Sequence, residues 1–578
     1  MDTAFSETAM AVLDARYLRR DESGRRIEDP SEMWSRVARA IAQPCAKFGE
    51  DPEFWQERFL HRLKRLEFLP NSPTLMNAGL PNGQLAACFV LPIEDDLDSI
   101  FQTLGLAAKI QRSGGGTGFS FSKLRPRGDV VRSTGGISSG AVSFMELFDR
   151  STALIRAGGR RRGANMAVLR VDHPDISEFV SAKSVSGKLE NFNLSVGMTD
   201  EFFSCLHSGK PLPLRDPRSG DVKRTLSAAD LLQQIVESAW AGGDPGLVFL
   251  DEMNRANPVP SLGRIEATNP CGEQPLLPYE SCTLGSLNLG KFVSARQLDR
   301  SALADAIRDA VVFLDNVIET NSYPVNAIRQ TTLDTRKLGL GVMGLADLLA
   351  EIGVPYDSEQ AVQLGGDIAK FITKTARKIS TELGRTRGSF PAFGASVWRE
   401  RGFDAMRNAT VTCVAPTGTI GVIAGASGGI EPFFALAARR RVLEGRTFIE
   451  LNRFLERKLK QCGPAGEAAL ALARETGSIR EAVGLPEELR RSFPIALEIT
   501  PEFHLRMQSA FQQHVDAAVS KTVNLPTDSS PDMVREVFLR AHDLRLKGVT
   551  VYRYGSRSGQ TLSLVDEGAS SDCRECSV

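Results

Sequence analysis

Three cysteines occupy positions from which a thiol could take part in chemistry. Cys271 lies between Asn269 and Glu273 in the run Asn-Pro-Cys-Gly-Glu, so a carboxamide and a carboxylate flank one thiol. Cys282 follows eleven residues later, and Cys88 lies far upstream. Most buried cysteines are inert, small apolar residues. A thiol between an amide and an acid instead indicates a site where a ligand is held and deprotonated.

A second candidate site is the turn Pro416-Thr417-Gly418-Thr419-Ile420. Two hydroxyl groups and several backbone amides lie close together around a glycine, and they could hold a phosphate if a helix begins there. The alternative is a plain strand-to-helix turn, which the local residue types alone favour.

Two further patterns have competing interpretations. Gly339-Leu-Gly-Val-Met-Gly344 matches a dinucleotide-binding motif, but that motif needs a strand–helix–strand unit closed by an acidic residue. Here we expect a helix from Leu345 and then a second long helix, so nicotinamide binding is not favoured. Cys573-Arg-Glu-Cys576 could be half of a zinc site or a redox dithiol. We favour the dithiol, carried on a mobile coil from 555 to 572 with a reach of roughly 23–25 Å.

Strand-like and helical segments alternate through most of the chain, which predicts an α/β architecture built on crossovers. Strands are expected at 166–171, 192–198 and 549–552. Helices are expected to start at Asp175, near Thr199 and at Pro531, the last ending at Leu546. The clearest helix is 301–318, whose apolar residues fall on one stripe.

Composition excludes several classes of protein. The chain has 42% hydrophobic and 24% charged residues, as a soluble globular protein does. Its 70 basic residues balance 70 acidic ones, which leaves no overall field for nucleic acid. We find no apolar run long enough for a membrane span, and no secretion signal. Nine unevenly spaced cysteines favour the cytoplasm over a disulfide framework, and the six histidines have no metal-ligand spacing, so we expect no metal site.

Six separated blocks resemble ribonucleotide reductases, in that family's order from about Phe68 to Tyr554. Blocks 267–274 and 281–288 resemble the finger loop, and 416–420 resembles the diphosphate-binding turn. The others are 70–79, 85–92 and the glycine-rich 113–119. Glycines there would let the backbone approach a ribose or base.

Residues near the C-terminal end of the matching region indicate which class of ribonucleotide reductase the chain resembles. Large subunits that depend on a separate metal subunit carry adjacent tyrosines, whereas here Arg553 separates Tyr552 from Tyr554. The segment 547–555, which contains these tyrosines, and the block 513–526 resemble the adenosylcobalamin-dependent, class II enzymes. The alternatives are a class I-type large subunit that needs a radical-generating metal subunit, and a non-catalytic nucleotide-binding relative.

The resemblance implies a fold and a division of the chain. The family fold is a ten-stranded α/β barrel of two antipodal five-stranded halves, with the radical cysteine on a central finger loop. We expect an N-terminal helical segment at 1–67 without an ATP-cone, the catalytic barrel at 68–554, and a flexible tail at 555–578.

The resemblance also implies the site. Cys271 would carry the thiyl radical, Glu273 would act as general base, and Asn269 would hold the sugar hydroxyls. Cys88 and Cys282 would be the reducing pair, which Cys573 and Cys576 would reset with a thioredoxin-like partner. The substrate, a ribonucleotide and more often a diphosphate in this family, would be bound by residues of the finger loop and four other segments: Ser72, Ala87, Cys88, Gly116, Asn269, Pro270, Cys271, Gly272, Glu273, Pro416, Thr417, Gly418, Thr419 and Ile420.

The cofactor would be adenosylcobalamin, for which the sequence identifies no contacting residue. A deoxynucleotide specificity effector near Glu94–Asp98 is compatible with the family pattern, and so is a homodimer.

Overall fold

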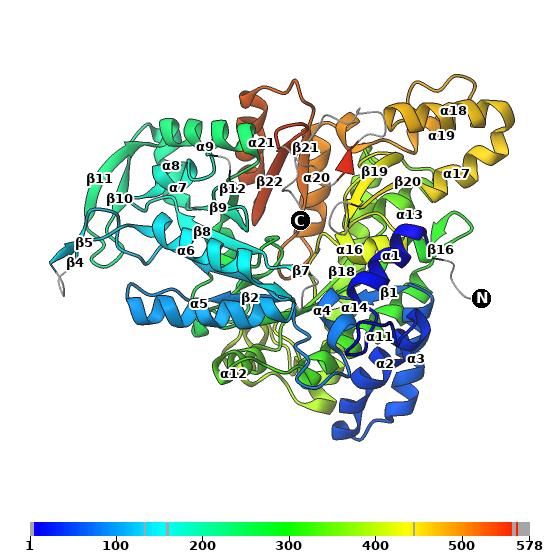
Figure 1. Cartoon of the computed structure of the whole chain (residues 1–578), viewed down its shortest axis with the longest axis horizontal. Coiled ribbons are helices and arrows are strands. Elements are labelled where there is room, and N and C mark those ends of the chain that lie inside the picture. The colour runs from blue at the N-terminus through cyan, green and yellow to red at the C-terminus, as the bar shows by residue number, and fades with distance from the viewer. Residues whose placement is uncertain are drawn as a thin grey trace.

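The chain folds around one mixed sheet of ten strands with helices on its outer side (Figure 1). The computed structural model describes residues 5–131, 135–157, 161–185, 187–442, 446–557 and 562–563. Within those ranges, no helix combines the length and the apolar character that crossing a membrane would require.

Five strands in the first half of the chain are neighbours in the sheet and all parallel. They are β2 (Cys88–Leu91), β3 (Gly116–Ser120), β8 (Asn165–Arg170), β9 (Phe192–Met198) and β12 (Gly246–Phe249). Their connections carry helices, including α5 (Leu97–Arg112), α6 (Ala141–Leu154) and α9 (Ala228–Gly242). Parallel strands covered in this way are largely buried, and most residues of these five strands are buried.

A second parallel set comes from residues 281–553: β15 (Ser281–Asn288), β18 (Leu338–Met343), β21 (Thr522–Leu525) and β22 (Gly548–Arg553). β15 pairs with β18, and β21 pairs with β22. Parallel bridges from Leu340 to Thr412 and from Val414 to Val519 connect β18 through the segment 410–414 to the residues before β21. The two sets meet in antiparallel pairs, β2 with β15 and β12 with β22. The pairing therefore continues from β2 around to β15.

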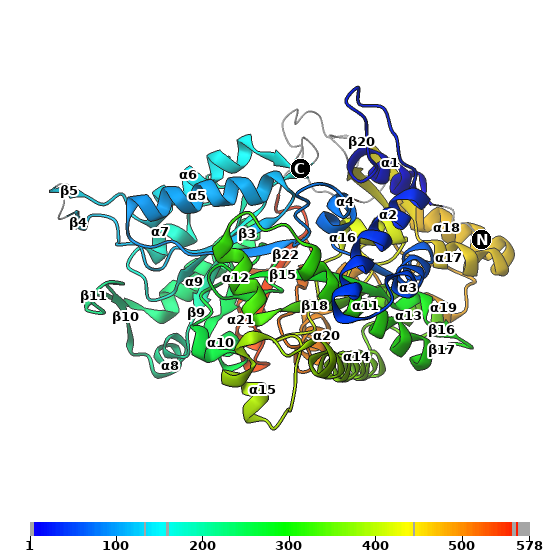
Figure 2. The ribbon, with the colours of Figure 1, turned by 90° about the horizontal axis from the view of Figure 1, so that it is seen from below.

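The N-terminal residues form helices that pack outside this sheet. α2 (Pro30–Ala42) and α3 (Pro52–Lys64) lie beside α11 (Arg300–Thr320), as Figure 2 shows. Asp29 starts α2 through a capping box with Glu32. β1 (Phe68–Pro70) then joins the sheet by pairing with β15.

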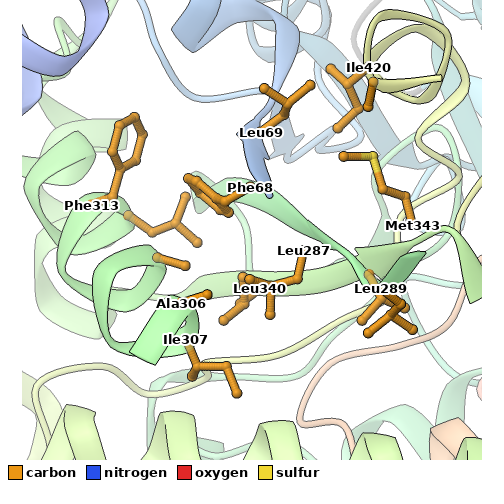
Figure 3. Close-up of a cluster of buried hydrophobic side chains, with 14 of the residues drawn as sticks. Phe68, Leu69, Leu287, Leu289, Ala306, Ile307, Phe313, Leu340, Met343 and Ile420 are labelled. Carbon is orange, nitrogen blue, oxygen red and sulfur yellow. The ribbon is translucent and has the colours of Figure 1, made fainter. Parts of the chain in front are cut away.

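The largest apolar cluster fills the space between these outer helices and the strands β1, β15 and β18 (Figure 3). Phe68 and Phe313 stack edge to face at 5.3 Å within it. Ile420, in α16 (Gly418–Ala424), belongs to the same cluster, so α16 is anchored on this core. A smaller cluster contains Cys88 and Cys282.

Most of the predicted elements are present in the structure. The predicted strands correspond to β8, β9 and β22, and the predicted helix 301–318 lies within α11. Asp175 and Thr199 directly precede α7 (Ile176–Val180) and α8 (Asp200–Ser208). One boundary is wrong: α21 (Pro531–Asp543) ends before Leu546, because Arg545 has a left-handed backbone with φ of 53°.

The glycine motif 339–344 has a packing role. Gly339 and Gly341 lie inside β18, which is buried throughout. A Cβ atom on Gly339 would lie 2.4 Å from Gln274 Nε2 and 2.7 Å from Cys413 Sγ, and one on Gly341 would lie 2.5 Å from the Cys413 carbonyl oxygen. The glycines therefore allow two neighbouring segments to approach β18 closely, and no nucleotide is needed to explain them.

Candidate active site

The run Asn269–Glu273 forms the tip of a short hairpin between β13 (Ala267–Thr268) and β14 (Pro275–Leu276). The tip is closed by hydrogen bonds from the backbone N–H of Gly272 to the Asn269 carbonyl (3.1 Å) and from the N–H of Gln274 to Asn269 Oδ1 (3.0 Å). Gly272 has φ of 83°, which a residue with a side chain rarely adopts. The sequence Asn-Pro-Cys-Gly-Glu thus builds a tight loop with Cys271 exposed on it.

The hairpin lies directly against β3. A Cβ on Gly118 would lie 1.8 Å from the Thr268 carbonyl oxygen, and a Cβ on Gly116 would lie 2.9 Å from the Pro270 ring. On β9, Asn193 donates a hydrogen bond from Nδ2 to the Pro270 carbonyl at 2.7 Å. These contacts fix the position of the loop, and no local pattern around Asn193 indicated that it would hold the Pro270 carbonyl.

Gly118→Ala should therefore displace the hairpin. The added methyl group meets a backbone oxygen that cannot rotate away, so we expect a loss of about 3 kcal/mol in the free energy of unfolding, the upper end of the usual cost of overpacking. Denaturant titration measures this loss. Gly105→Ala is the matched control, because a Cβ there meets no atom within 4 Å and should change stability by less than about 1 kcal/mol. Equal stability of the two variants would contradict the close contact.

Cys88 and Cys282 are directly opposed across the antiparallel pair of β2 and β15. Opposed residues in such a pair have Cα atoms about 4.5–5.5 Å apart, within the range that a disulfide requires. Both cysteines are buried, and burial is the main reason that the pKa of each thiol is well above its usual value. The structure thus brings together two protonated thiols that lie 194 positions apart in sequence.

Asn269 links this pair to the loop, since its Nδ2 donates to Cys88 Sγ at 3.2 Å. Glu273 is also buried, and its Oε2 atom has no hydrogen-bond partner among the described residues. Burial raises the pKa of Glu273 to about 7, against a smaller opposing effect of Asn269. A carboxyl group poised near neutral pH can act as a general base.

Two neighbours of the pair were not expected from the sequence. Lys337 and Glu280 form a buried ion pair at 2.6 Å, and Cys282 Sγ lies 3.5 Å from the Lys337 carbonyl oxygen. Cys413, which carries no motif, is buried in the same cluster as Cys88 and Cys282. Only the fold reveals these contacts, because each comes from a different segment of the chain.

The predicted substrate residues fall on segments around the loop. Ser72 begins α4 (Ser72–Asn77), and its hydroxyl group is hydrogen-bonded to that of Tyr17 at 2.7 Å. The Ala87 carbonyl accepts from the Gly116 N–H at 2.7 Å, and Gly116 lies against the Pro270 ring and pairs with Cys88 across β2 and β3.

The turn 416–420 leads into α16. Thr417 precedes this helix in a left-handed conformation, and its Oγ1 accepts from the Gly429 N–H at 2.7 Å. Pro416 and Thr419 are half-buried, Gly418 is exposed, and Ile420 is buried. The predicted tail cysteines Cys573 and Cys576 lie outside the described residues. Within 555–578 the structure describes 555–557 and β23 (Leu562–Ser563), which pairs with β19 (Ala437–Val442).

Comparison with known proteins gives consistent matches over most of the chain. The model of the ribonucleotide reductase barrel domain matches residues 86–552, and that of the ribonucleotide reductase all-alpha domain matches residues 3–83.

Two curated relatives carry the same name, Vitamin B12-dependent ribonucleoside-diphosphate reductase. The one from Mycobacterium tuberculosis (strain CDC 1551 / Oshkosh) is 52% identical over 562 residues, covering 96% of this chain and 80% of the relative. The one from Thermoplasma acidophilum is 43% identical over 620 residues, covering 97% and 80%.

Among solved structures, the Actinobacillus ureae class Id ribonucleotide reductase alpha subunit superposes with a TM-score of 0.77. The superposition covers 95% of this chain and 97% of that one, at 23% identity, and so supports the fold alone.

Proposed function

The chain belongs to the vitamin B12-dependent, class II ribonucleotide reductases, and we propose that Cys271, Cys88 and Cys282 carry its radical and redox chemistry. The enzyme reduces ribonucleoside diphosphates to 2′-deoxyribonucleotides. The observation that carries the assignment of residues is the hydrogen bond of Asn269 to Cys88, which connects the Cys271 loop to the opposed thiol pair.

We propose the barrel of two antipodal five-stranded halves as the finer description of the fold. One half would be the five parallel strands from β2 to β12, and the other would be β15, β18, 410–414, the segment 517–525 and β22. The bridges at Thr412 and Val519 support this arrangement. The hairpin 267–276 would be the central finger loop. The division at 1–67, 68–554 and 555–578 remains part of the proposal, supported by the pairing of β1 from Phe68 onward.

The tip of the hairpin has open space through which a large cofactor can approach. Cys271 is exposed, and a Cβ on Gly272 would meet no heavy atom within 4 Å, so the tip has space around it. Adenosylcobalamin, when bound, supplies the radical that oxidises the Cys271 thiol. Every other group that the reaction needs belongs to the chain or to the substrate.

In the proposed reaction, the Cys271 thiyl takes the hydrogen atom from C3′ of the ribose, and Glu273 accepts the 3′-hydroxyl proton. Asn269 holds the sugar hydroxyls. The 2′-hydroxyl leaves as water with one proton from the thiol pair. Cys88 and Cys282 then supply the second hydrogen, which forms the new C2′–H bond, together with two electrons, and become a disulfide, while Glu273 returns its proton to the 3′ oxygen. Cys271 finally returns the hydrogen atom to C3′. The sum is one nucleotide and two thiols giving one deoxynucleotide, one disulfide and one water.

We also propose how the substrate is held and where the enzyme works. Ser72, Ala87, Gly116, Pro270 and Gly272 would contact the nucleoside, and residues 416–420 would hold the diphosphate. Backbone amides and threonine hydroxyls are suitable phosphate donors. A deoxynucleotide effector and a homodimer belong to the same proposal, as does a cytoplasmic location.

The pH dependence of turnover tests the role of Glu273. Because the base must be ionised, kcat/KM should rise about tenfold per pH unit below pH 7 and level off above it. Glu273→Gln should lower turnover by about 10²- to 10⁴-fold and remove this dependence. Glu266→Gln, at a half-exposed acid just before the hairpin, is the control.

The same residue affects stability. Between about pH 4.5 and 7 the folded protein holds a proton that the unfolded chain has lost, so stability should fall by about 3 kcal/mol as the pH rises through this range. Glu273→Gln should lack this fall. For catalysis, a wild-type kcat/KM that does not change from pH 6 to 8 would contradict the assignment of Glu273 as the base.

Thiolate exchange from Cys573 and Cys576 would reset the Cys88–Cys282 disulfide, and a thioredoxin-like protein would reset the tail. Replacing both tail cysteines with serine should cripple turnover with thioredoxin but spare it with dithiothreitol. Equal loss with both reductants, measured as deoxynucleotide formed, would argue against this role.

The function itself is tested by anaerobic conversion of CDP or ADP by the purified chain with dithiothreitol, with and without adenosylcobalamin. Product that depends on the cofactor excludes an obligatory second subunit. No product under either condition would favour the class I-type or the non-catalytic alternative.

A further inference from the structure

A cavity of about 260 Å³ lies between the start of α1 (Glu7–Arg16), the last turn of α16 and the first turn of α17 (Arg453–Leu459). Figure 1 shows α1 beside α16, and the two helices are in contact. None of the residues assigned to the reaction lines this cavity. It is therefore separate from the proposed catalytic site.

Apolar and basic side chains line different parts of the cavity. Leu66, Val422, Ile423 and Phe454 supply apolar surface. Lys291, Arg453 and Arg457 add three basic groups, all three residues being exposed. Ligand sites commonly combine apolar walls with a few polar groups that fix the orientation of the ligand.

The basic groups are short of negative partners. Arg457 pairs with Glu351, but in the described part of the chain neither Lys291 nor Arg453 forms an ion pair. The negative charge of Glu67 raises the pKa of Lys291, but Glu67 already forms ion pairs with Arg62 at 2.6 Å and with Arg65 at 2.5 Å.

The pKa of Lys291 is affected by the lack of a paired acid. Although the residue is exposed, partial desolvation of its side chain by the surrounding protein is the main reason that the pKa of Lys291 is lowered, and the like charges of Arg65 and Arg453 lower it further. Cations that converge without an acid leave a place for an anion.

We propose that this cavity binds a small phosphorylated molecule with a flat or apolar body, its phosphate held by Lys291 and Arg453. The guanidinium of Arg453 can bind two phosphate oxygens at once, and Lys291 adds a point charge. The body of the ligand lies on Leu66, Val422 and Phe454. The volume is close to the lower end of ligand pockets, roughly 300 Å³, so the site suits one ring and one phosphate rather than a dinucleotide.

Pyridoxal 5′-phosphate is a suitable probe, because it has a ring, a phosphate and an aldehyde. The aldehyde condenses with the Lys291 amine to an imine and releases water, and sodium borohydride then reduces the imine to a stable secondary amine. Peptide mapping by mass spectrometry locates the label. This measurement needs neither the cofactor nor turnover, so its failure is distinct from a failure of the proposed function.

The expected result is that Lys291 labels at least about tenfold faster than Lys460, an exposed lysine paired with Glu456. Inorganic pyrophosphate should protect Lys291, and Arg453→Gln should slow its labelling about tenfold. Arg480→Gln, at an exposed residue outside the cavity lining, should not.

Pyridoxal, which lacks the phosphate, separates binding from simple reactivity of the amine. Labelling of Lys291 by pyridoxal as fast as by the phosphorylated probe would overturn the proposal. So would unchanged labelling in Arg453→Gln, or a lack of protection by pyrophosphate.

Discussion

Cys271→Ser should bind nucleotide like the wild type and form no detectable deoxynucleotide. A serine O–H bond is much stronger than a cysteine S–H bond, so the radical cannot be formed or passed on at this position. A barrier raised by only about 4 kcal/mol would already slow turnover about 10³-fold. Because Cys271 is exposed at the loop tip and the loop is closed by backbone and Asn269 hydrogen bonds, the substitution should leave the fold intact.

The measurement pairs anaerobic turnover of CDP with equilibrium binding of CDP to the same sample. Cys462→Ser is the matched control, since Cys462 is half-buried in a region outside the site and its thiol donates a hydrogen bond to the Lys458 carbonyl. The control should retain full activity. Turnover by Cys271→Ser at even a tenth of the wild-type rate would remove Cys271 from its radical role.

The sequence predicted the elements whose apolar residues repeat regularly, and the site residues that lie together in one local motif. The strand 192–198 and the helix around 301–318 could be predicted because their apolar residues repeat with a fixed period. Asn269, Cys271 and Glu273 could be predicted because they stand within five consecutive residues.

Contacts between distant segments could not be read from periodicity. The opposition of Cys88 to Cys282 was expected only from the resemblance to a family, and nothing local indicated that Asn193 would hold the Pro270 carbonyl. The motif at 339–344 shows the converse problem. Its letters fit nucleotide binding, but the fold uses the small size of glycine to admit Gln274 and Cys413.

The buried pair Lys337–Glu280 illustrates a third limit. Lysine and glutamate are ordinarily exposed, so no composition rule places them inside a barrel. Their burial is tolerated because each neutralises the other at 2.6 Å. Pairing of this kind depends on two strands being neighbours, and so it emerges only once the sheet is formed.

Cys88→Ser and Cys282→Ser should each block repeated turnover whichever reductant is supplied. The proposed reaction withdraws two electrons from this pair, and a single remaining thiol cannot close the disulfide that releases them. The loss should therefore be the same with dithiothreitol as with thioredoxin, unlike the loss from the tail variant. It should exceed about 10²-fold, since residues that act as a unit fail together when one is removed.

A reductant-free experiment makes the test sharper. Prereduced wild-type protein, given CDP and cofactor but no reductant, should form product only until its thiol pairs are consumed, with a matching loss of titratable thiols. Cys88→Ser and Cys282→Ser should each form less product per protein than the wild type under these conditions. Cys205→Ser, which alters a cysteine of α8 outside the site, should form as much product as the wild type. Sustained multiple turnover by Cys88→Ser or Cys282→Ser would mean that the electrons come from elsewhere, and the buried Cys413 beside the pair would then be the first thiol to replace.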